Sequence, residues 1–310
     1  MSTLRTVVLA GASGFMGQHL RARLVADGVH VRTIGRSVDA DARWGQELSG
    51  VLEGADALVN LAGRSVSCRY TKATIDEIFA SRTQTTRALG EALAACDAPP
   101  AVWVNASTGT IYRDARDRPQ DEATGELGTG FSVEVARAWE RELFTPRLPA
   151  VRRVALRTSI VLGNGGALNA IVNLARLGAG GHQGDGGQVF SWVHLEDVYR
   201  AVRHVLADDR ASGPVNLATP HPVTNAELMR TVRAHFGGLG ERVGLPTPAW
   251  ALGLGGRVIR TEPELVLKSR WVHPGVLLDS GFTWAFPTLD EALADIAATT
   301  PRGLLPVQLG

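Results

Sequence analysis

The sequence predicts an α/β fold in which a doubly wound, mostly parallel sheet is followed by a smaller C-terminal α/β lobe. Strand-like apolar runs alternate with helix-like periodicities through the first two-thirds of the chain, as in parallel sheets with crossover helices. The first strand runs into a turn with regularly spaced glycines that opens a helix. Beyond about Gly163 the chain becomes glycine-rich. We therefore expect domains at 1–165 and 166–310, which interleave if Leu195–Leu217 returns to the sheet.

Each element follows from its own residue pattern. Short apolar runs predict strands over Val7–Ala10, His30–Ile34, Ala57–Leu61, Ala101–Ala106, Val154–Leu156 and Pro214–Leu217. Apolar residues at helical spacing predict helices after the glycine turn and over Ile75–Ala94, Ser132–Phe144, Leu195–Leu206, Glu262–Leu267 and Leu289–Ile296. A further helix is expected to begin at Thr224, which with Glu227 resembles a capping box.

Composition excludes several classes of function. The chain of 310 residues is 45% hydrophobic and has a formal net charge of +1, so no general attraction to nucleic acid or an anionic membrane is expected. Its apolar runs are too short to span a bilayer, and the first strand begins too early to leave room for a signal peptide. Cys68 and Cys96 follow no metal pattern, and the histidines form no ligand-spaced cluster. We expect a metal-free cytoplasmic protein with free thiols.

The glycine turn after the first strand predicts a dinucleotide site. Gly11, Gly14 and Gly17 stand at three-residue spacing between a strand and a helix. A diphosphate needs such a place, because it requires close backbone approach, free N–H groups and the positive end of a helix dipole. The cofactor-binding residues expected here are Gly11, Ser13, Gly14, Phe15, Met16 and Gly17. The alternative is a strand-to-helix turn without a ligand.

The end of the second strand favours NADP(H) over NAD(H). NAD-binding sheets of this kind usually place an acid there for the ribose 2′-hydroxyl. This chain instead has Arg36 and Ser37, which could hold a 2′-phosphate. Asp39 and Asp41 lie too far along to be the obvious ribose partners. The alternative is that Arg36 is a solvated loop charge.

Two further strand ends complete the expected site. Leu61, Ala62 and Gly63 would let the cofactor pass close to the sheet on its adenosine-ribose and diphosphate side. On the next strand end, Ala106 is expected at the cofactor, and Ser107 and Thr108 offer hydroxyls to a carbonyl or alcohol oxygen. Hydroxyls also cap strand ends without chemistry, so a structural role stays open.

Together these residues resemble the extended short-chain dehydrogenase/reductase superfamily. Within it the chain is similar to an atypical, sugar-nucleotide-epimerase-like (NAD-dependent epimerase/dehydratase-like) branch. The supporting motifs include Gly11-x-x-Gly14-x-x-Gly17, Asn60-Leu61-Ala62-Gly63, Ser81-Arg82-x-x-Thr85-Thr86, Ser191-Trp192-Val193-His194-x-x-Asp197 and Gly281-Phe282-x-Trp284-x-Phe286-Pro287. The resemblance covers essentially the whole chain and implies a Rossmann-type domain and a nicotinamide dinucleotide cofactor, but it does not imply a particular substrate.

The resemblance also exposes a catalytic gap. Short-chain dehydrogenases normally use a Tyr-x-x-x-Lys pair, and none of the three tyrosines here has a lysine four residues on. At the expected place stand Phe131 and Val135, which cannot transfer a proton. Tyr112 is the best substitute, with Arg116 able to lower its pKa by folding back, but a packing role is as well supported.

Weaker substitutes are Glu134 and the loop Cys68–Tyr70, while His194 and Asp197 are expected to make structural hydrogen bonds. The hypothesis is therefore an NADP(H)-dependent oxidoreductase or epimerase-like enzyme acting on a small polar substrate such as a sugar, alcohol or ketone. Its expected catalytic residues are Ser107, Thr108 and Tyr112. The alternative is a catalytically degenerate NADP-binding sensor or structural partner. A homodimer is compatible with the sequence, which does not fix the oligomeric state.

Overall fold

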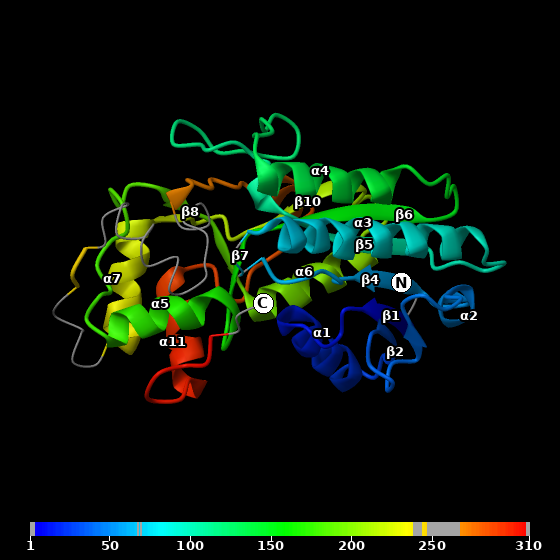
Figure 1. Ribbon diagram of the computed structural model, residues 1–310, viewed down its shortest axis with the longest axis horizontal. Coiled ribbons are helices and arrows are strands. Elements are labelled where there is room, and N and C mark those ends of the chain that lie inside the picture. Colours follow the sequence, from blue (N-terminus) through cyan, green and yellow to red (C-terminus); the bar gives the residue numbers. More distant parts are fainter. Residues whose placement is uncertain (1–3, 67, 69, 238–243, 247–266, 308–310) are drawn as a thin grey trace.

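The computed structural model describes residues 4–66, 68, 70–237, 244–246 and 267–307 (Figure 1). The helix predicted over Glu262–Leu267 lies, apart from its last residue, outside these ranges. The strands are β1 (Thr6–Ala10), β2 (His30–Gly35), β3 (Ala42–Arg43), β4 (Ala57–Asn60), β5 (Val102–Thr108), β6 (Arg152–Thr158), β7 (Ile160–Leu162), β8 (Val189–Phe190), β9 (Trp192–His194), β10 (Gly213–Leu217) and β11 (Val223–Thr224). The helices are α1 (Phe15–Ala26), α2 (Ser49–Leu52), α3 (Lys72–Ala94), α4 (Phe131–Phe144), α5 (Gly166–Arg176), α6 (Leu195–Ala207), α7 (Asn225–Phe236), α10 (Gly275–Asp279) and α11 (Leu289–Thr299), with a 3₁₀ turn, η1 (Gly109–Ile111).

A seven-stranded sheet organises the molecule, with strand order β10-β6-β5-β4-β1-β2-β3. All of its pairings are parallel. The predicted α/β fold class with a doubly wound parallel sheet is thus confirmed. From β1 the chain moves to β2 on one side and then returns to β4 on the other, so the carboxyl ends of β1 and β4 flank the topological switch point. Ligands bind at such a crevice in open α/β sheets.

Both faces of the sheet are covered by helices, and Figure 1 shows α3 and α4 on the side opposite α1. Val7–Ala10 of β1 is fully buried, as the unbroken apolar run predicts. One core joins the sheet to α1 and α6 through residues such as Leu20 and Val202. The other joins it to α2, α3 and α4 through residues such as Leu89 and Leu143. The carboxyl ends of the strands are thereby fixed as a rigid edge.

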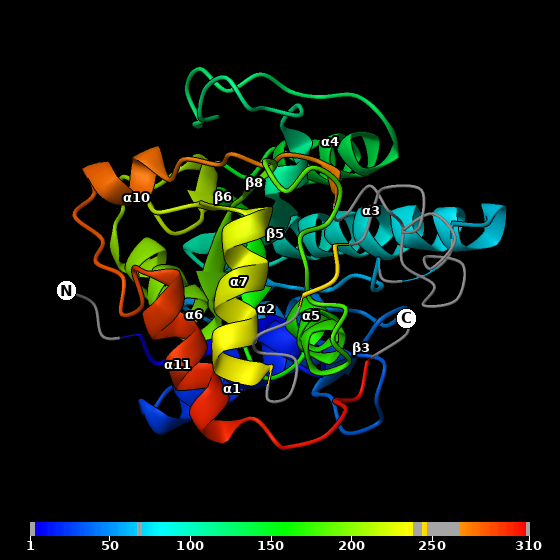
Figure 2. The ribbon, with the colours of Figure 1, turned by 90° about the vertical axis from the view of Figure 1, so that its left-hand side faces the viewer.

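A second lobe, seen in Figure 2, packs α5, α7 and α11 around a separate core that includes Val172, Val232 and Leu293. Two small sheets, antiparallel β8/β11 and parallel β7/β9, connect it to the main sheet. Thr224 caps α7 by accepting a hydrogen bond from the Glu227 amide. The segment that follows α5 and this lobe's first strands includes α6 and β10, and β10 forms the edge of the main sheet beside β6. Within the described ranges no helix is both long and apolar enough to cross a membrane.

Candidate functional site

The turn after β1 is packed directly on the end of β4. Gly11 has φ +81°, a left-handed conformation that favours glycine. A Cβ built on Gly11 would lie 2.7 Å from the carbonyl carbon of Leu61 and 2.8 Å from the amide nitrogen of Ala62. The structure therefore brings two of the sequence-predicted segments, the glycine turn and the Leu61–Gly63 loop, into contact at the switch point.

The other two glycines of the turn have different tasks. A Cβ on Gly17 would lie 2.1 Å from the Gly11 carbonyl oxygen, so Gly17 lets α1 pack onto the turn. Among the described residues, a Cβ on Gly14 would meet only this same oxygen, at 3.4 Å, so this side of Gly14 is open. Gly14 is the N-cap of α1, gives no side-chain cap, and no acid stands in the helix's first turn. The first N–H groups of a helix lack intrahelical acceptors, so this end of α1 suits an anion.

Phe15 joins the two lobes at the helix start. Its ring atoms lie 3.0–3.2 Å from the positions that a Cβ would take on Gly163, Gly165 and Gly166, around the start of α5. The phenyl ring thus fits against backbone that carries no side chains. The glycines at 163–166 therefore leave room for Phe15, which places the α1 N-terminus at the junction of the main sheet and the second lobe.

The end of β2 leaves Arg36 available and removes one competing acid. Arg36 is exposed and makes no ion pair with the part of the chain that the structure describes. Asp41 is engaged at β2 itself, where it accepts hydrogen bonds from the Thr33 amide at 2.7 Å and hydroxyl at 2.8 Å. The Ser37 hydroxyl bonds Asp39 at 3.2 Å. Among the described residues Arg36 therefore has no ion-pair partner, and Ser37 lies beside it.

A buried amide network holds the end of β4. The Asn60 side chain donates to Asn105 Oδ1 on β5 at 2.7 Å, and its Oδ1 accepts from the Ala62 amide at 3.0 Å. It also lies 3.3 Å from the Thr86 hydroxyl of α3. Asn60 is fully buried, so each of these bonds avoids the cost of an unpaired polar group. This network sets the path of the Leu61–Gly63 loop; sequence reasoning quoted Asn60 only as part of a motif.

Ser107 and Tyr112 belong to one buried polar chain. The Ser107 hydroxyl donates to Glu140 Oε1 on α4 at 2.7 Å. Glu140 forms a two-pronged ion pair with Arg157 on β6, with both N–O distances 2.8 Å. Arg157 also donates to the Tyr112 hydroxyl, which in turn donates to Asn216 Oδ1, each at 2.9 Å. These hydroxyls are therefore already engaged within the protein.

Arg116 does not fold back on Tyr112. The prediction that Arg116 lowers the pKa of Tyr112 is therefore wrong. Arg116 pairs with Asp185 at 2.7 Å instead. The cation at Tyr112 is Arg157, but burial is the larger influence and raises the pKa of the phenol above its ordinary value. Near neutral pH the hydroxyl stays protonated. The long sequence separation of Tyr112 and Arg157 hid this pairing.

Replacing Tyr112 by phenylalanine should mainly affect stability. The variant leaves Asn216 Oδ1 and one Arg157 N–H without their partner in a buried place, which costs about 1–3 kcal/mol of unfolding free energy. Urea denaturation of the two proteins measures this loss. Unchanged stability together with lost turnover on a substrate would instead favour the proton-transfer role.

Thr108 points to the other face of β5, because successive strand side chains alternate. It is half-buried, and its hydroxyl lies 2.8 Å from the Thr110 hydroxyl. Lys268, one of only two lysines in the chain, donates to the Thr110 carbonyl at 3.3 Å. The contact of Lys268 with Thr110 could not be predicted from the sequence, because 158 residues separate the two partners. Of the three hydroxyl residues predicted from the sequence, Thr108 is therefore the one that does not belong to the buried hydrogen-bond network of Ser107 and Tyr112.

The positions of the absent Tyr/Lys pair are apolar and packed. Phe131 opens α4, and its ring meets Tyr70 with centroids 4.7 Å apart and Phe79 at 5.7 Å. Val135 is buried one turn later, in a cluster with Ile78. The structure thus fills these two positions with a hydrophobic cluster between α3 and α4.

His194 and Asp197 make the structural contacts expected of them. Asp197 is fully buried and accepts the amides of Ala285 and Phe286 at 2.7 and 3.0 Å. Burial raises the pKa of Asp197. His194 caps α6 by accepting from the Glu196 amide, and burial lowers its pKa to about 4. Both tie α6 to the second lobe.

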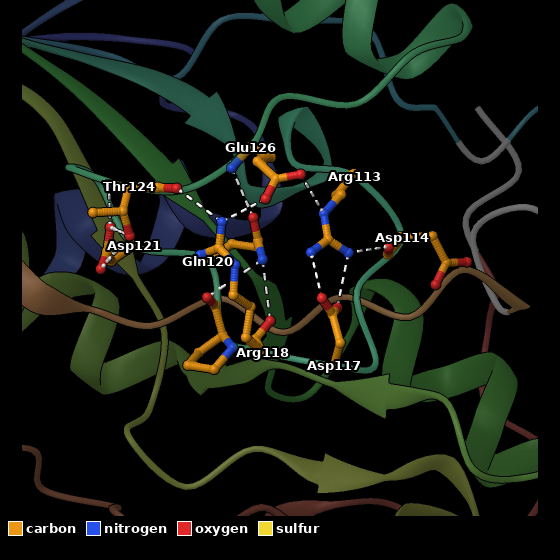
Figure 3. A network of polar contacts seen from close by, with 9 residues as sticks. Arg113, Asp114, Asp117, Arg118, Gln120, Asp121, Thr124 and Glu126 are labelled. Atoms are coloured by element: carbon orange, nitrogen blue, oxygen red, sulfur yellow. Dashed lines mark hydrogen bonds and ion pairs between the residues drawn. The ribbon is translucent and has the colours of Figure 1, made fainter.

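The loop between η1 and α4 is held by its own charges, as Figure 3 shows. Arg113 bonds Asp117 at 2.8 Å and Glu126 at 2.9 Å. Gln120 accepts the Glu126 amide at 2.7 Å. These contacts close the loop on itself beside Tyr112, which explains a fixed path for a long connection. Within the described ranges, no three His, Cys, Asp or Glu side chains gather to hold a metal ion.

Comparison with known proteins adds to this geometry. Residues 7–218 match the model of the NAD dependent epimerase/dehydratase family, and residues 247–296 match a domain of unknown function, DUF1731. The human epimerase family protein SDR39U1 is 31% identical over 300 residues, covering 94% of this chain and 99% of that protein. The epimerase family protein Mb2239 of Mycobacterium bovis is 34% identical over 307 residues, covering 95% and 98%.

Solved structures show the same architecture. The crystal structure of human SDR39U1 (isoform 2) with NADPH superposes with a TM-score of 0.84 at 31% identity, covering 95% of this chain and 99% of that one. A nucleoside-diphosphate sugar epimerase from Corynebacterium glutamicum gives a TM-score of 0.75 at 28% identity, covering 95% of this chain and 58% of that one.

Proposed function

The chain belongs to the NAD dependent epimerase/dehydratase family, within the extended short-chain dehydrogenase/reductase superfamily, and we propose that it is an NADP(H)-dependent enzyme of this family. The proposal is an oxidoreductase or epimerase-like reaction on a small polar substrate. The main observation in support is that the glycine turn after β1 packs on the Leu61–Gly63 loop. In addition, Gly14 leaves open space at the start of α1. That arrangement fits a diphosphate, and human SDR39U1 was crystallised with NADPH.

The cofactor would lie along the carboxyl ends of the strands. The amides of Ser13, Phe15 and Met16, around the open side of Gly14, would receive the diphosphate. Leu61, Ala62, Gly63 and Ala106 would line its path across the sheet. Arg36 and Ser37 would hold the 2′-phosphate, since Arg36 is exposed and Asp41 is occupied at β2.

Arg36→Glu should weaken NADPH much more than NADH. A charge-assisted contact to the 2′-phosphate contributes about 1.5–3 kcal/mol, so its loss lowers NADPH affinity by roughly ten- to a hundredfold. NADH lacks that phosphate and should change little. Calorimetric titration with both nucleotides gives the comparison. Arg21→Glu is the matched control, because Arg21 is an exposed arginine on the outside of α1. Equal losses for NADPH and NADH would remove Arg36 from the site.

Bound NADP(H) would supply or accept the hydride. In this proposal Thr108 places its hydroxyl at the substrate oxygen, while Ser107 and Tyr112 fix the end of β5 from within the buried chain. These separate roles are supported by two observations: Thr108 is half-buried, and its hydroxyl contacts Thr110 and not the buried network of Ser107 and Tyr112. Glu140 and Arg157 act as positioning residues for Ser107 and Tyr112.

The packed apolar cluster at Phe131 and Val135 favours a second candidate, an NADP(H)-binding sensor without catalysis. NADPH consumption over a panel of sugars, alcohols and ketones separates the two. Turnover of any of them supports the enzyme. Tight NADPH binding with no turnover across the panel supports the sensor, and absence of NADPH binding removes both.

A further inference from the structure

The guanidinium of Arg82 on α3 lies beside Gly63, just after the end of β4. The position that a Cβ would take on Gly63 lies 3.3 Å from the Arg82 Cζ and 3.5 Å from its Nη2, so the guanidinium rests on bare backbone. On its other side the guanidinium covers the Trp139 ring of α4, with Cζ 5.0 Å from the ring centroid. Its Nη1 donates to the Ile78 carbonyl at 3.1 Å. Arg82 is thus held in one place by three contacts, none of which supplies negative charge.

Arg82 lacks a carboxylate partner within the described ranges, unlike Arg64 and Arg87. Arg64 pairs with Glu77, and Arg87, five residues further along α3, pairs with Glu142 at 2.6 Å. Burial lowers the pKa of Arg82 to about 10, so the guanidinium still carries its charge near neutral pH. Among the described residues this half-buried cation has no counter-ion, which is costly unless a ligand supplies one.

The location of Arg82 is that of the candidate site. Leu61 and Ala62 touch the glycine turn, and Gly63 directly follows them. The guanidinium of Arg82 therefore lies on the same edge of the sheet as the proposed diphosphate site. Arg82 also stands one helical turn beyond Ile78, which packs on Val135. The cation therefore lies between the proposed cofactor and the α4 face.

We propose that Arg82 is an anion-binding residue of this site. Its remaining N–H groups donate hydrogen bonds to the oxygens of a phosphate or carboxylate group on a bound ligand. The planar guanidinium matches the geometry of such groups. Two ligands could bring this chemistry, the diphosphate of NADP(H) or an anionic group on the substrate. Both sources rest on the proposed function, whereas the anion-binding role of Arg82 by itself does not.

The test compares wild type with two variants. Arg82→Gln removes the charge, and Arg82→Lys keeps the charge but lacks the planar guanidinium that can bind two oxygens at once. Arg87→Gln is the control, since Arg87 lies on the same helix, is exposed and already has a carboxylate partner. Each protein, with its folding checked by thermal unfolding, is titrated calorimetrically with 2′-phospho-ADP-ribose, which carries the diphosphate without the nicotinamide. A second titration adds inorganic phosphate to the protein, both free and saturated with NADPH.

If the diphosphate is the partner, Arg82→Gln weakens 2′-phospho-ADP-ribose by roughly ten- to a hundredfold, with a smaller loss in Arg82→Lys and none in Arg87→Gln. If the substrate brings the anion, that affinity is unchanged, and the NADPH-saturated protein binds phosphate in wild type but not in Arg82→Gln. Equal behaviour of Arg82→Gln and Arg87→Gln in both titrations overturns the proposal. A wild type that fails to bind NADPH but binds phosphate through Arg82 refutes the proposed function and leaves this inference standing.

Discussion

Glu140→Ala should lower the free energy of unfolding by about 3–5 kcal/mol, the range for removing one partner of a buried ion pair. The side chains of Glu140 and Arg157 are 11% and 8% exposed, and they meet through two N–O distances of 2.8 Å. Burial opposes the charge on Arg157, yet the bonds with Glu140 hold the pKa of the guanidinium above its ordinary value. The alanine variant leaves that charge buried without compensation and removes the acceptor of the Ser107 hydroxyl.

Glu142→Ala is the matched control for this experiment. Glu142 lies on the same helix and pairs with Arg87, whose side chain is 57% exposed. Exposed pairs contribute at most about 1 kcal/mol, so the control should unfold close to wild type. Urea denaturation of the three proteins makes the comparison. Similar midpoints for Glu140→Ala and Glu142→Ala would show that the buried chain adds nothing to stability.

Gly17→Ala should abolish most cofactor binding. The added methyl would stand 2.1 Å from the Gly11 carbonyl oxygen, and neither the turn nor α1 can move without disturbing β1 and the Leu61–Gly63 loop. Overpacking of this kind costs about 1–3 kcal/mol even where flexible side chains can adjust, and here both elements are backbone. We expect NADPH affinity to fall by roughly a hundredfold, which corresponds to about 2.7 kcal/mol.

Two other glycines calibrate that result. A Cβ on Gly50 of α2 meets no atom of the described residues within 4 Å, so Gly50→Ala should bind NADPH as wild type does. Gly14→Ala should keep the stability of wild type but lose affinity, because its methyl would occupy the open side where the diphosphate is expected. Calorimetric titration with NADPH and thermal unfolding of all three variants give both quantities. Wild-type affinity in Gly17→Ala would remove the turn from the binding site.

Local sequence signals predicted the parts of the site that one stretch of chain builds by itself. The glycine turn, the helix predicted over Ser132–Phe144 and the cap at Thr224 all depend on neighbours within a few residues. The partners of Tyr112 could not be found this way, since Arg157 and Asn216 lie 45 and 104 residues further on.

One signal in the sequence could have found the buried ion pair. Val133, Ala136, Glu140 and Leu143 are spaced as an apolar helix stripe, and all four are buried. A glutamate in such a stripe needs a cation or a hydrogen-bond donor inside the protein. Which cation it meets depends on the β5–β6 register that sets Ser107 beside Arg157, and that register is a property of the assembled sheet.

The position of β10 governs how this chain acquires its structure during synthesis. Because β10 pairs with β6 through residues 213–217, the edge of β6 stays unpaired until more than fifty residues after it have left the ribosome. α6, which completes one core of the sheet, arrives over the same interval. A fragment ending near residue 165 would therefore expose an open strand edge and an uncovered apolar face, the combination that promotes aggregation. Splitting the chain at that point yields a nucleotide-binding half that is incomplete as a folding unit.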